Sequence, residues 1–248
     1  MEPKIRAVSK YPPPWLLNEF PLKFARCIGK EIIARLAADH TGAIEGETWE
    51  QMFAVSLGAV WQPSNVGLDD VVLGDCAWGA KTVKSGKPFT TKDVRLISGR
   101  NDPKYSYGHR PKKPELLGEM VLGIWNQRVT EVRKNYRHAR SIVLIKPNKN
   151  QMKKEWLDFA IFEFDTVQYE PKEYVWAFNK NKNLEGYCRE TKEHYFTWQH
   201  HGAQFTVIHK IPKGRLKLQV KNPPRVETEV VLNAVKYDDS WVRVLPPK

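Results

Sequence analysis

Residues 67–84 read GLDDVVLGDCAWGAKTVK, and this stretch decides the fold that we expect. Two short strand-like runs, Val71–Leu73 and Ala77–Lys84, flank the dipeptide Gly74-Asp75, which is typical of a tight turn. The pattern predicts a β-hairpin. Acidic residues stand at the mouth of its first strand and a lysine lies within its second strand, so these side chains can converge on one point.

The elements predicted before and after the hairpin extend it to an α/β core. A helix is predicted to begin near Glu47, before the hairpin. After the hairpin come a strand over Lys92–Ser98, a helix over Pro114–His138 and a nearly all-apolar strand over Ser141–Ile145, which suits burial on both faces. The order is helix, three strands, helix, strand. The second helix can therefore serve as the crossover that places the last strand in the same sheet.

The rest of the chain is expected to add to this core without forming a second domain. Residues 1–45 are interpreted as an N-terminal helical arm with a helix over Leu22–Ala38, residues 46–146 as the catalytic core, and residues 147–248 as a mostly β extension. The further strand candidates are Trp156–Phe164, Tyr174–Phe178, His194–Trp198, Gln204–His209 and Arg215–Val220. The predicted fold is a single α/β domain, with a central mixed sheet flanked by helices and additional β-structure in the C-terminal half.

Composition narrows the class of protein. The 248 residues include 40 Lys and Arg against 28 Asp and Glu, a net charge of +12, which favours a polyanionic partner such as nucleic acid. No run approaches 18 apolar residues and the N-terminus has no apolar signal region, so we expect a cytoplasmic protein without a membrane span. Cys27, Cys76 and Cys188 are isolated, which excludes a zinc ribbon or CxxC redox motif. No Walker loop occurs, so no nucleotide cofactor is expected.

The residues of the hairpin match what phosphodiester hydrolysis needs. Carboxylates such as those of Asp69 and Asp70 can bind Mg²⁺, a hard cation that prefers oxygen ligands. The metal stabilises charge on the scissile phosphate and helps to generate hydroxide, and a lysine such as Lys81 can orient the water or the phosphate. The hairpin therefore predicts a Mg²⁺-dependent hydrolytic site.

The segment Asp70-Val71-Val72-Leu73 … Gly79-Ala80-Lys81 resembles the PD…(D/E)xK signature of type II restriction endonucleases. The core of that family has the same helix, three strands, helix, strand order, and the resemblance covers residues 45–146. It implies a site-specific endodeoxyribonuclease that uses Mg²⁺. The family often carries an acidic residue on its first helix, which Glu50 or Glu47 matches here.

The sequence departs from the signature at Gly79, which occupies the place of the second acidic residue. Since glycine cannot bind a metal, Glu50 or Asp75 is expected to supply the missing carboxylate. The candidate catalytic residues are Asp70, Lys81, Asp69 and Glu50, and the candidate metal ligands are Asp70, Asp75 and Glu50.

Contacts to DNA are expected from two polar segments, 100–110 and 179–201, together with Arg95 on the third strand. Arg, Asn and Gln side chains pair with base edges in the major groove, and Lys and Arg neutralise phosphates. The candidates are Arg95, Arg100, Asn101, Lys104, Tyr105, Arg110, Asn179, Asn181, Arg189, Gln199, His200 and His201. Alternatively, the first segment is a solvated loop, and residues 179–183 of the second form only a polar hairpin turn.

These observations favour a type II restriction enzyme that binds double-stranded DNA as a homodimer, because a two-fold protein matches a palindromic site. Two alternatives stay open. One is a DNA repair or recombination nuclease with the same core, and the other is a non-catalytic DNA- or RNA-binding protein, for which the missing acid at Gly79 is the best argument.

Overall fold

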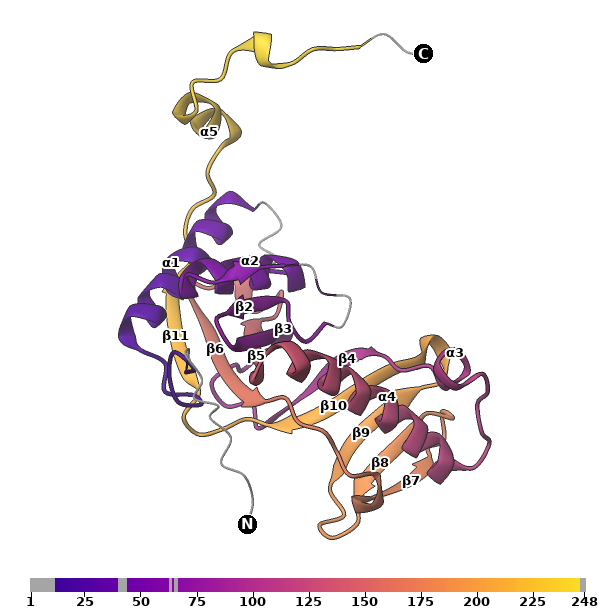
Figure 1. The fold of residues 1–248 in the computed structure, drawn as a ribbon. Coiled ribbons are helices and arrows are strands. Elements are labelled where there is room, and N and C mark those ends of the chain that lie inside the picture. The colour runs from indigo at the N-terminus through magenta and orange to yellow at the C-terminus, as the bar shows by residue number, and fades with distance from the viewer. Residues whose placement is uncertain (1–11, 40–43, 63, 65–66, 246–248) are drawn as a thin grey trace, which may run out of the picture.

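The computed structural model describes residues 12–39, 44–62, 64 and 67–245. It is a mixed α/β structure in which a six-stranded mixed sheet, curved as a half-barrel, lies beside a five-stranded antiparallel sheet (Figure 1). The helices of the described residues are α1 (Leu22–Ala38), α2 (Gly46–Leu57), α3 (Pro103–Tyr107), α4 (Pro114–Asn135) and α5 (Thr228–Ala234). The strands are β1 (Val60–Trp61), β2 (Val71–Leu73), β3 (Cys76–Ser85), β4 (Asp93–Arg100), β5 (His138–Pro147), β6 (Trp156–Asp165), β7 (Tyr174–Phe178), β8 (Leu184–Cys188), β9 (His194–Gln199), β10 (Gln204–Lys210) and β11 (Leu216–Lys221).

The first sheet has the strand order β1-β2-β3-β5-β6-β11. The predicted hairpin is confirmed, because β2 and β3 pair antiparallel with Leu73 opposite Cys76. Strand β3 runs parallel to β5 along ten paired residues, and α4 lies between them in the chain. The predicted crossover is therefore confirmed, and so is the burial of the apolar strand at the centre of the sheet.

The third strand of the core differs from the prediction. The strand predicted over Lys92–Ser98 is β4, but it pairs with β10 in the second sheet and not with the hairpin. In the first sheet the two-residue strand β1 pairs with β2 instead. The order helix, three strands, helix, strand thus holds for α2, β1, β2, β3, α4 and β5, with β4 and α3 inserted before α4.

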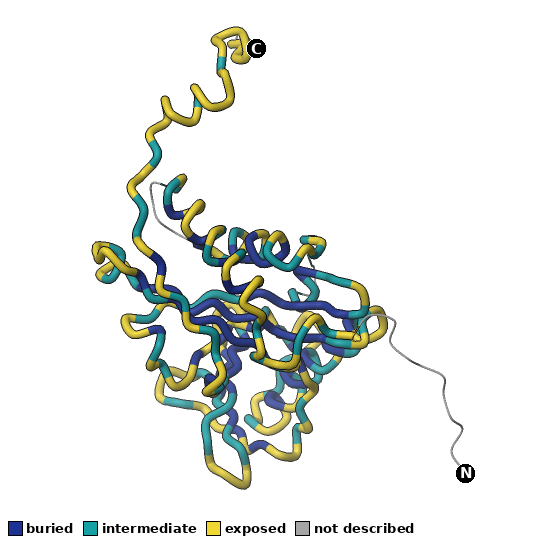
Figure 2. The backbone as a smooth tube through the Cα atoms, turned by 90° about the vertical axis from the view of Figure 1, so that its left-hand side faces the viewer, coloured by how far each residue is buried: buried dark blue, intermediate teal, exposed yellow. Residues whose placement is uncertain are grey.

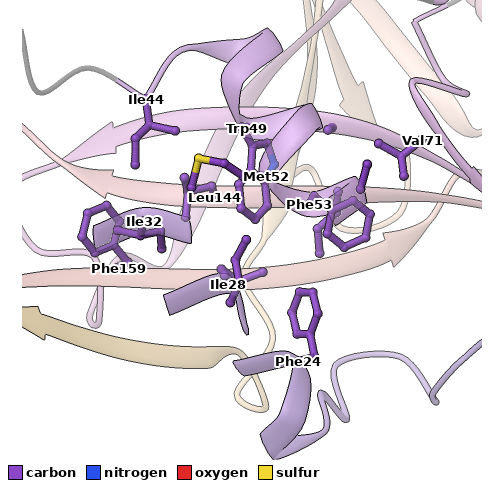
Figure 3. Close-up of a cluster of buried hydrophobic side chains, with 14 of the residues drawn as sticks. Phe24, Ile28, Ile32, Ile44, Trp49, Met52, Phe53, Val71, Leu144 and Phe159 are labelled. Carbon is purple, nitrogen blue, oxygen red and sulfur yellow. The ribbon is translucent and has the colours of Figure 1, made fainter. Parts of the chain in front are cut away.

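Helices α1 and α2 cover one face of the first sheet (Figure 1). Phe24, Ile28 and Ile32 of α1 pack in the same buried cluster as Trp49 and Phe53 of α2 (Figure 3). We expected residues 1–45 to be an arm, and for α1 this was wrong, because its apolar stripe is part of the core. Residues 1–11 lie outside the described residues.

The second sheet has the order β4-β10-β9-β8-β7, and α4 packs against it (Figure 1). Val121 and Val129 of α4 belong to one buried cluster with Phe196 and Phe205 of the sheet. A Cβ atom at Gly118 would lie 2.2 Å from Cδ2 of Trp176, so glycine is required for α4 to approach this closely.

A buried polar network connects the segment before α1 to the first sheet. Arg140 Nη1 donates to Glu163 Oε1 at 2.8 Å, and the indole nitrogens of Trp15 and Trp78 donate to the same carboxylate at 2.8 and 3.1 Å. Burial raises the pKa of Glu163, and the positive charge of Arg140 opposes this. The ring of donors therefore keeps the carboxylate paired inside the core.

The chain leaves the body after β11. Residues 222–245, which include α5, extend away from both sheets and are mostly exposed (Figures 1 and 2). None of the helices described is both long and apolar enough to cross a membrane.

Candidate active site

A depression of about 280 Å³ lies where the two sheets meet, and it is formed by α2, β3 and β4. Strand β3 pairs with β5 along its whole length but with β2 only as far as Trp78. From Gly79 onward, no strand of the described residues pairs with the other edge of β3. The lining includes Glu50 of α2, Lys81 of β3 and Arg95 of β4. Three predicted site residues from distant parts of the chain therefore meet at one place.

Asp70 and Lys81 form the centre of this site. Asp70 directly precedes β2, is only 6% exposed, and accepts a hydrogen bond from the backbone nitrogen of Ala80 at 3.0 Å. Lys81 Nζ lies 3.6 Å from Asp70 Oδ2 and donates to the carbonyl oxygen of Gly67 at 3.2 Å. The hairpin register brings the acid at the mouth of β2 beside the lysine of β3, as the sequence predicted.

Glu50 is the second carboxylate of the site. Its Oε2 accepts a hydrogen bond from the indole nitrogen of Trp61 at 3.1 Å. Burial raises the pKa of Glu50, the bond from Trp61 opposes this, and the negative charge of Asp70 raises it further. Because Asp70 and Lys81 both influence the titration of Glu50, the three groups form one electrostatic unit.

Asp69, which was predicted to be catalytic, has its hydrogen-bond partners outside this unit. Its carboxylate accepts a hydrogen bond from the hydroxyl of Ser64, and its carbonyl oxygen accepts one from Gln62 Nε2 at 3.3 Å. The carboxylate of Asp69 therefore faces Ser64, whereas that of Asp70 faces the backbone of Ala80. Asp69 holds the loop that precedes β2.

Asp75, which was predicted to be a metal ligand, also lies away from this unit. It occupies the turn between β2 and β3, and the Leu73–Cys76 pair places it four residue steps from Asp70 along the strand direction, or about 13 Å. Its carbonyl oxygen accepts from the backbone nitrogen of His138, and its charge acts on His138 and Cys76. A carboxylate at the turn therefore cannot replace one at Gly79.

The glycine at position 79 has a structural cause. A Cβ atom there would lie 3.1 Å from the carbonyl oxygen of Gly67 and 3.2 Å from Cα of Leu68. The loop before β2 thus lies across the position at which the restriction-enzyme signature carries an acid. Glu50, which reaches the site from α2, is the carboxylate that the structure places beside Asp70 and Lys81.

Arg128 of α4 is a site residue that the sequence reasoning missed. Its Nη1 donates to the carbonyl oxygen of Ser98 and lies 3.5 Å from Asn101 Oδ1. Burial lowers the pKa of Arg128, and the charge of Asp70 raises it. The sequence does contain a feature that could have indicated this residue. An arginine between Trp125 and Val132 lies near the buried face of an amphipathic helix, where burial of a charge is costly.

The donor set fits a single Mg²⁺ better than a cage made of protein ligands. In the part of the chain that the structure describes, no group of three His, Cys, Asp or Glu side chains stands close enough together to hold a metal. Asp70 and Glu50 offer hard carboxylate oxygens, the charge of Asp70 raises the pKa of Glu50, and Mg²⁺ usually takes one or two carboxylates and keeps several waters.

The two segments predicted to contact DNA meet at one end of the second sheet. Gln204 of β10 stands opposite Arg100 of β4 on one side and opposite Gln199 of β9 on the other. Arg110 Nη1 lies 3.4 Å from His200 Nδ1 and its guanidinium covers the ring of Trp198 at 4.9 Å. Lys104, Tyr105, Asn181 and His201 are exposed.

Three of the predicted DNA contacts do not fit this surface. Asn101 is fully buried and donates to the carbonyl oxygen of Val121 at 2.9 Å, so its amide cannot reach a base. The side chain of Asn179 closes the β7–β8 turn by accepting from the backbone nitrogens of Asn181 and Asn183 at 2.9 and 3.1 Å. Arg189 lies at the opposite end of the sheet, where it donates to the carbonyl oxygen of Lys172 at 3.1 Å.

A second depression, of about 380 Å³, lies at the same end as Arg100 and Gln199. Leu117 and Phe178 contribute apolar walls, and the basic residues of its lining are Arg110, Lys112, Lys182 and His200. Lys112 and Lys182 were not singled out in the sequence, because isolated lysines in polar loops carry no pattern.

Comparison of the chain with protein-family models, with curated proteins and with solved structures gave no match in any of the three.

Proposed function

We propose that the protein is a Mg²⁺-dependent hydrolase, an endodeoxyribonuclease that cuts double-stranded DNA at specific sites in the manner of a type II restriction enzyme. The observation that carries the proposal is the pairing of Lys81 with the buried Asp70 at an open depression that Lys81 and Glu50 line. Two carboxylates and an ammonium group at one sheet edge are what phosphodiester hydrolysis requires.

Each residue has a distinct part in this proposal. Asp70 and Glu50 would hold the metal, which when bound supplies positive charge at the scissile phosphate and lowers the pKa of a water. Lys81 is partly exposed and directs its ammonium group toward the same carboxylate, so it can orient the attacking water or a phosphate oxygen. Arg95 is exposed on the opposite wall and can neutralise a neighbouring phosphate.

Strand β4 relates the cutting site to the proposed recognition surface. Arg95 lines the catalytic depression, and Arg100 lies five residues further along the strand, about 17 Å away. That distance is about five base-pair steps of duplex DNA at 3.4 Å each. A duplex that follows β4 would therefore present one phosphate to Lys81 and base edges several pairs away to Arg100, Gln199 and His200.

A plasmid-cleavage experiment tests this proposal. Asp70→Asn and Lys81→Met should each lower Mg²⁺-dependent cleavage by a factor of about 10³ or more, because both groups act on the transition state. Their affinity for DNA should stay within about threefold of wild type, since neither group reads bases. Sequencing the fragment ends should reveal one discrete site.

Matched controls lie on the same hairpin. Asp75→Asn at its turn and Lys84→Met further along β3 should keep wild-type cleavage. If both site variants cut as well as the controls, the site assignment is wrong. Cuts that follow DNA structure instead of sequence would indicate a repair or recombination nuclease.

A second candidate, a non-catalytic nucleic-acid-binding protein, is favoured by one observation. The signature position at Gly79 has no acid and is crowded by the Gly67–Leu68 backbone. Tight DNA binding without cleavage in Mg²⁺ or Mn²⁺ would support this candidate over the nuclease.

A further inference from the structure

The C-terminal arm, defined here as residues 227–245, exposes an unusual amount of apolar surface. Six of its side chains are between 48% and 80% exposed, although they belong to large apolar types: Val230, Val231, Val235, Trp241, Val242 and Leu245. None of the residues of α5 is buried. Contiguous apolar surface of this kind on a soluble protein usually marks a contact with another protein.

The root of the arm is attached firmly to the end of α1. The guanidinium of Arg225 donates to the carbonyl oxygens of Leu36 and Asp39, and the backbone nitrogen of Val226 donates to that of Ala37 at 3.0 Å. Pro223 and Pro224 precede this anchor and stiffen the chain. The arm therefore starts from a fixed point and projects away from its own body (Figures 1 and 2).

The charge of the arm points to the kind of partner. Residues 227–245 contain four acidic and two basic side chains, a net charge of −2, so the remainder of this +12 chain carries +14. Phosphates would repel the acidic arm, which argues against a contact with DNA. A basic protein surface attracts it, and every other copy of this chain presents such a surface.

The outer face of α1 has the complementary character. Lys23, Arg26, Lys30 and Ile33 are exposed and recur at helical spacing opposite the buried stripe of the helix. This face is basic and partly apolar, whereas the arm is acidic and apolar. It also lies on the helix whose C-terminal end anchors the arm, so two copies related by a two-fold axis can exchange arms reciprocally.

We propose that the arm is a dimerisation element that packs on the outer face of α1 in a second copy of this chain. The proposed function includes a homodimer, and this proposal identifies the contact surface of that homodimer. Only the role of the dimer in cutting rests on the proposed function. The contact itself does not depend on cleavage, so its test uses no DNA.

Sedimentation velocity on the full-length protein tests the contact. Wild type should sediment as a dimer. Trp241→Ala and Val231→Asp should each raise the dissociation constant of the dimer about thirtyfold or more, as expected for a central apolar anchor. Val167→Asp, the same kind of change at an exposed valine outside the arm, should leave the dimer intact.

Charge reversal tests the receiving surface. The double variant Glu227→Lys/Glu229→Lys should dissociate the dimer, and so should Arg26→Glu/Lys30→Glu. The combined fourfold variant should recover most of the lost affinity, because the opposite signs are restored, whereas a merely structural role of these exposed residues would give no recovery. A wild-type monomer, dimerisation that is unaffected by the arm variants, or a fourfold variant that stays dissociated would each overturn the proposal.

Discussion

Glu50 is a partly buried carboxylate of the proposed metal site, and its protonation affects the stability of the fold. Because burial raises its pKa, the folded protein binds the Glu50 proton more tightly than the unfolded chain does. The stability from this group is complete below its unfolded pKa and is lost as the pH rises through its folded pKa. At neutral pH without divalent metal, ionised Glu50 therefore destabilises the fold.

We expect Glu50→Gln to raise the melting temperature at pH 7 by about 2–4 °C in the absence of metal. Added Mg²⁺ should raise the melting temperature of wild type but not that of Glu50→Gln, since the variant has lost a charged ligand. Scanning calorimetry with and without Mg²⁺ measures both effects. Glu119→Gln, at an exposed position of α4 whose charge does not act on Glu50, is the control and should behave as wild type.

Gly79 is the residue where the restriction-enzyme signature and the structure disagree most directly. We expect Gly79→Asp to lower the free energy of unfolding by about 1–3 kcal/mol, because the added side chain crowds the backbone of Gly67 and Leu68. Cleavage should fall as well, although the substitution restores the acid of the signature. Urea unfolding measures the change in stability, and higher activity in the variant would contradict this account. Gly29→Ala, where nothing lies within 4 Å of the added carbon, should be neutral or stabilising.

At the scale of elements, the contact between β6 and β10 joins the two sheets and depends on a neutral histidine. His209 of β10 stacks on Phe164 of β6 with ring centroids 3.7 Å apart, and burial lowers the pKa of His209 from 6.5 to about 4. Because the pKa of His209 is lower in the folded protein than in the unfolded chain, the stability that its neutral ring contributes is present above pH 6.5. This contribution is lost as the pH falls toward 4.

Wild type should therefore lose about 2–3 kcal/mol more of its unfolding free energy between pH 6.5 and pH 4 than His209→Phe loses over the same range. Chemical denaturation at several pH values gives this difference. For His201→Gln, at an exposed position, the unfolding free energy should depend on pH as it does for wild type. Parallel pH profiles for wild type and His209→Phe would show that protonation of His209 does not weaken this contact.

At the scale of the whole molecule, the described residues of one chain form one candidate active site, so the proposed nuclease needs two copies to cut both strands together. We expect the dimer-weakening variant Val231→Asp to convert supercoiled plasmid first to the open circle and only later to the linear form. Wild type and Val167→Asp should give linear product directly. Gel analysis of a time course distinguishes the two outcomes, and direct linearisation by a monomeric variant would argue against cutting by a dimer.

Local patterns in the chain were sufficient for much of the architecture. The predicted bounds Leu22–Ala38 and Val71–Leu73 coincide with α1 and β2, because hydrophobic periodicity and turn residues act over a few neighbours. The pairing of Asp70 with Lys81 was also predictable, since a tight turn brings the two strands of a hairpin into register.

The tertiary structure decided the features that depend on distant partners. The alternating pattern of β4 predicts a strand but not that its neighbour is β10, more than a hundred residues later. The two residues of β1 are too few for any period to appear. Asn101 was predicted to contact DNA, but packing buries it. The position of α2 brings Glu50 close enough to Asp70 for the charge of Asp70 to raise the pKa of Glu50. Burial and electrostatic coupling arise between surfaces that meet only when the chain folds. A local sequence pattern therefore does not predict them.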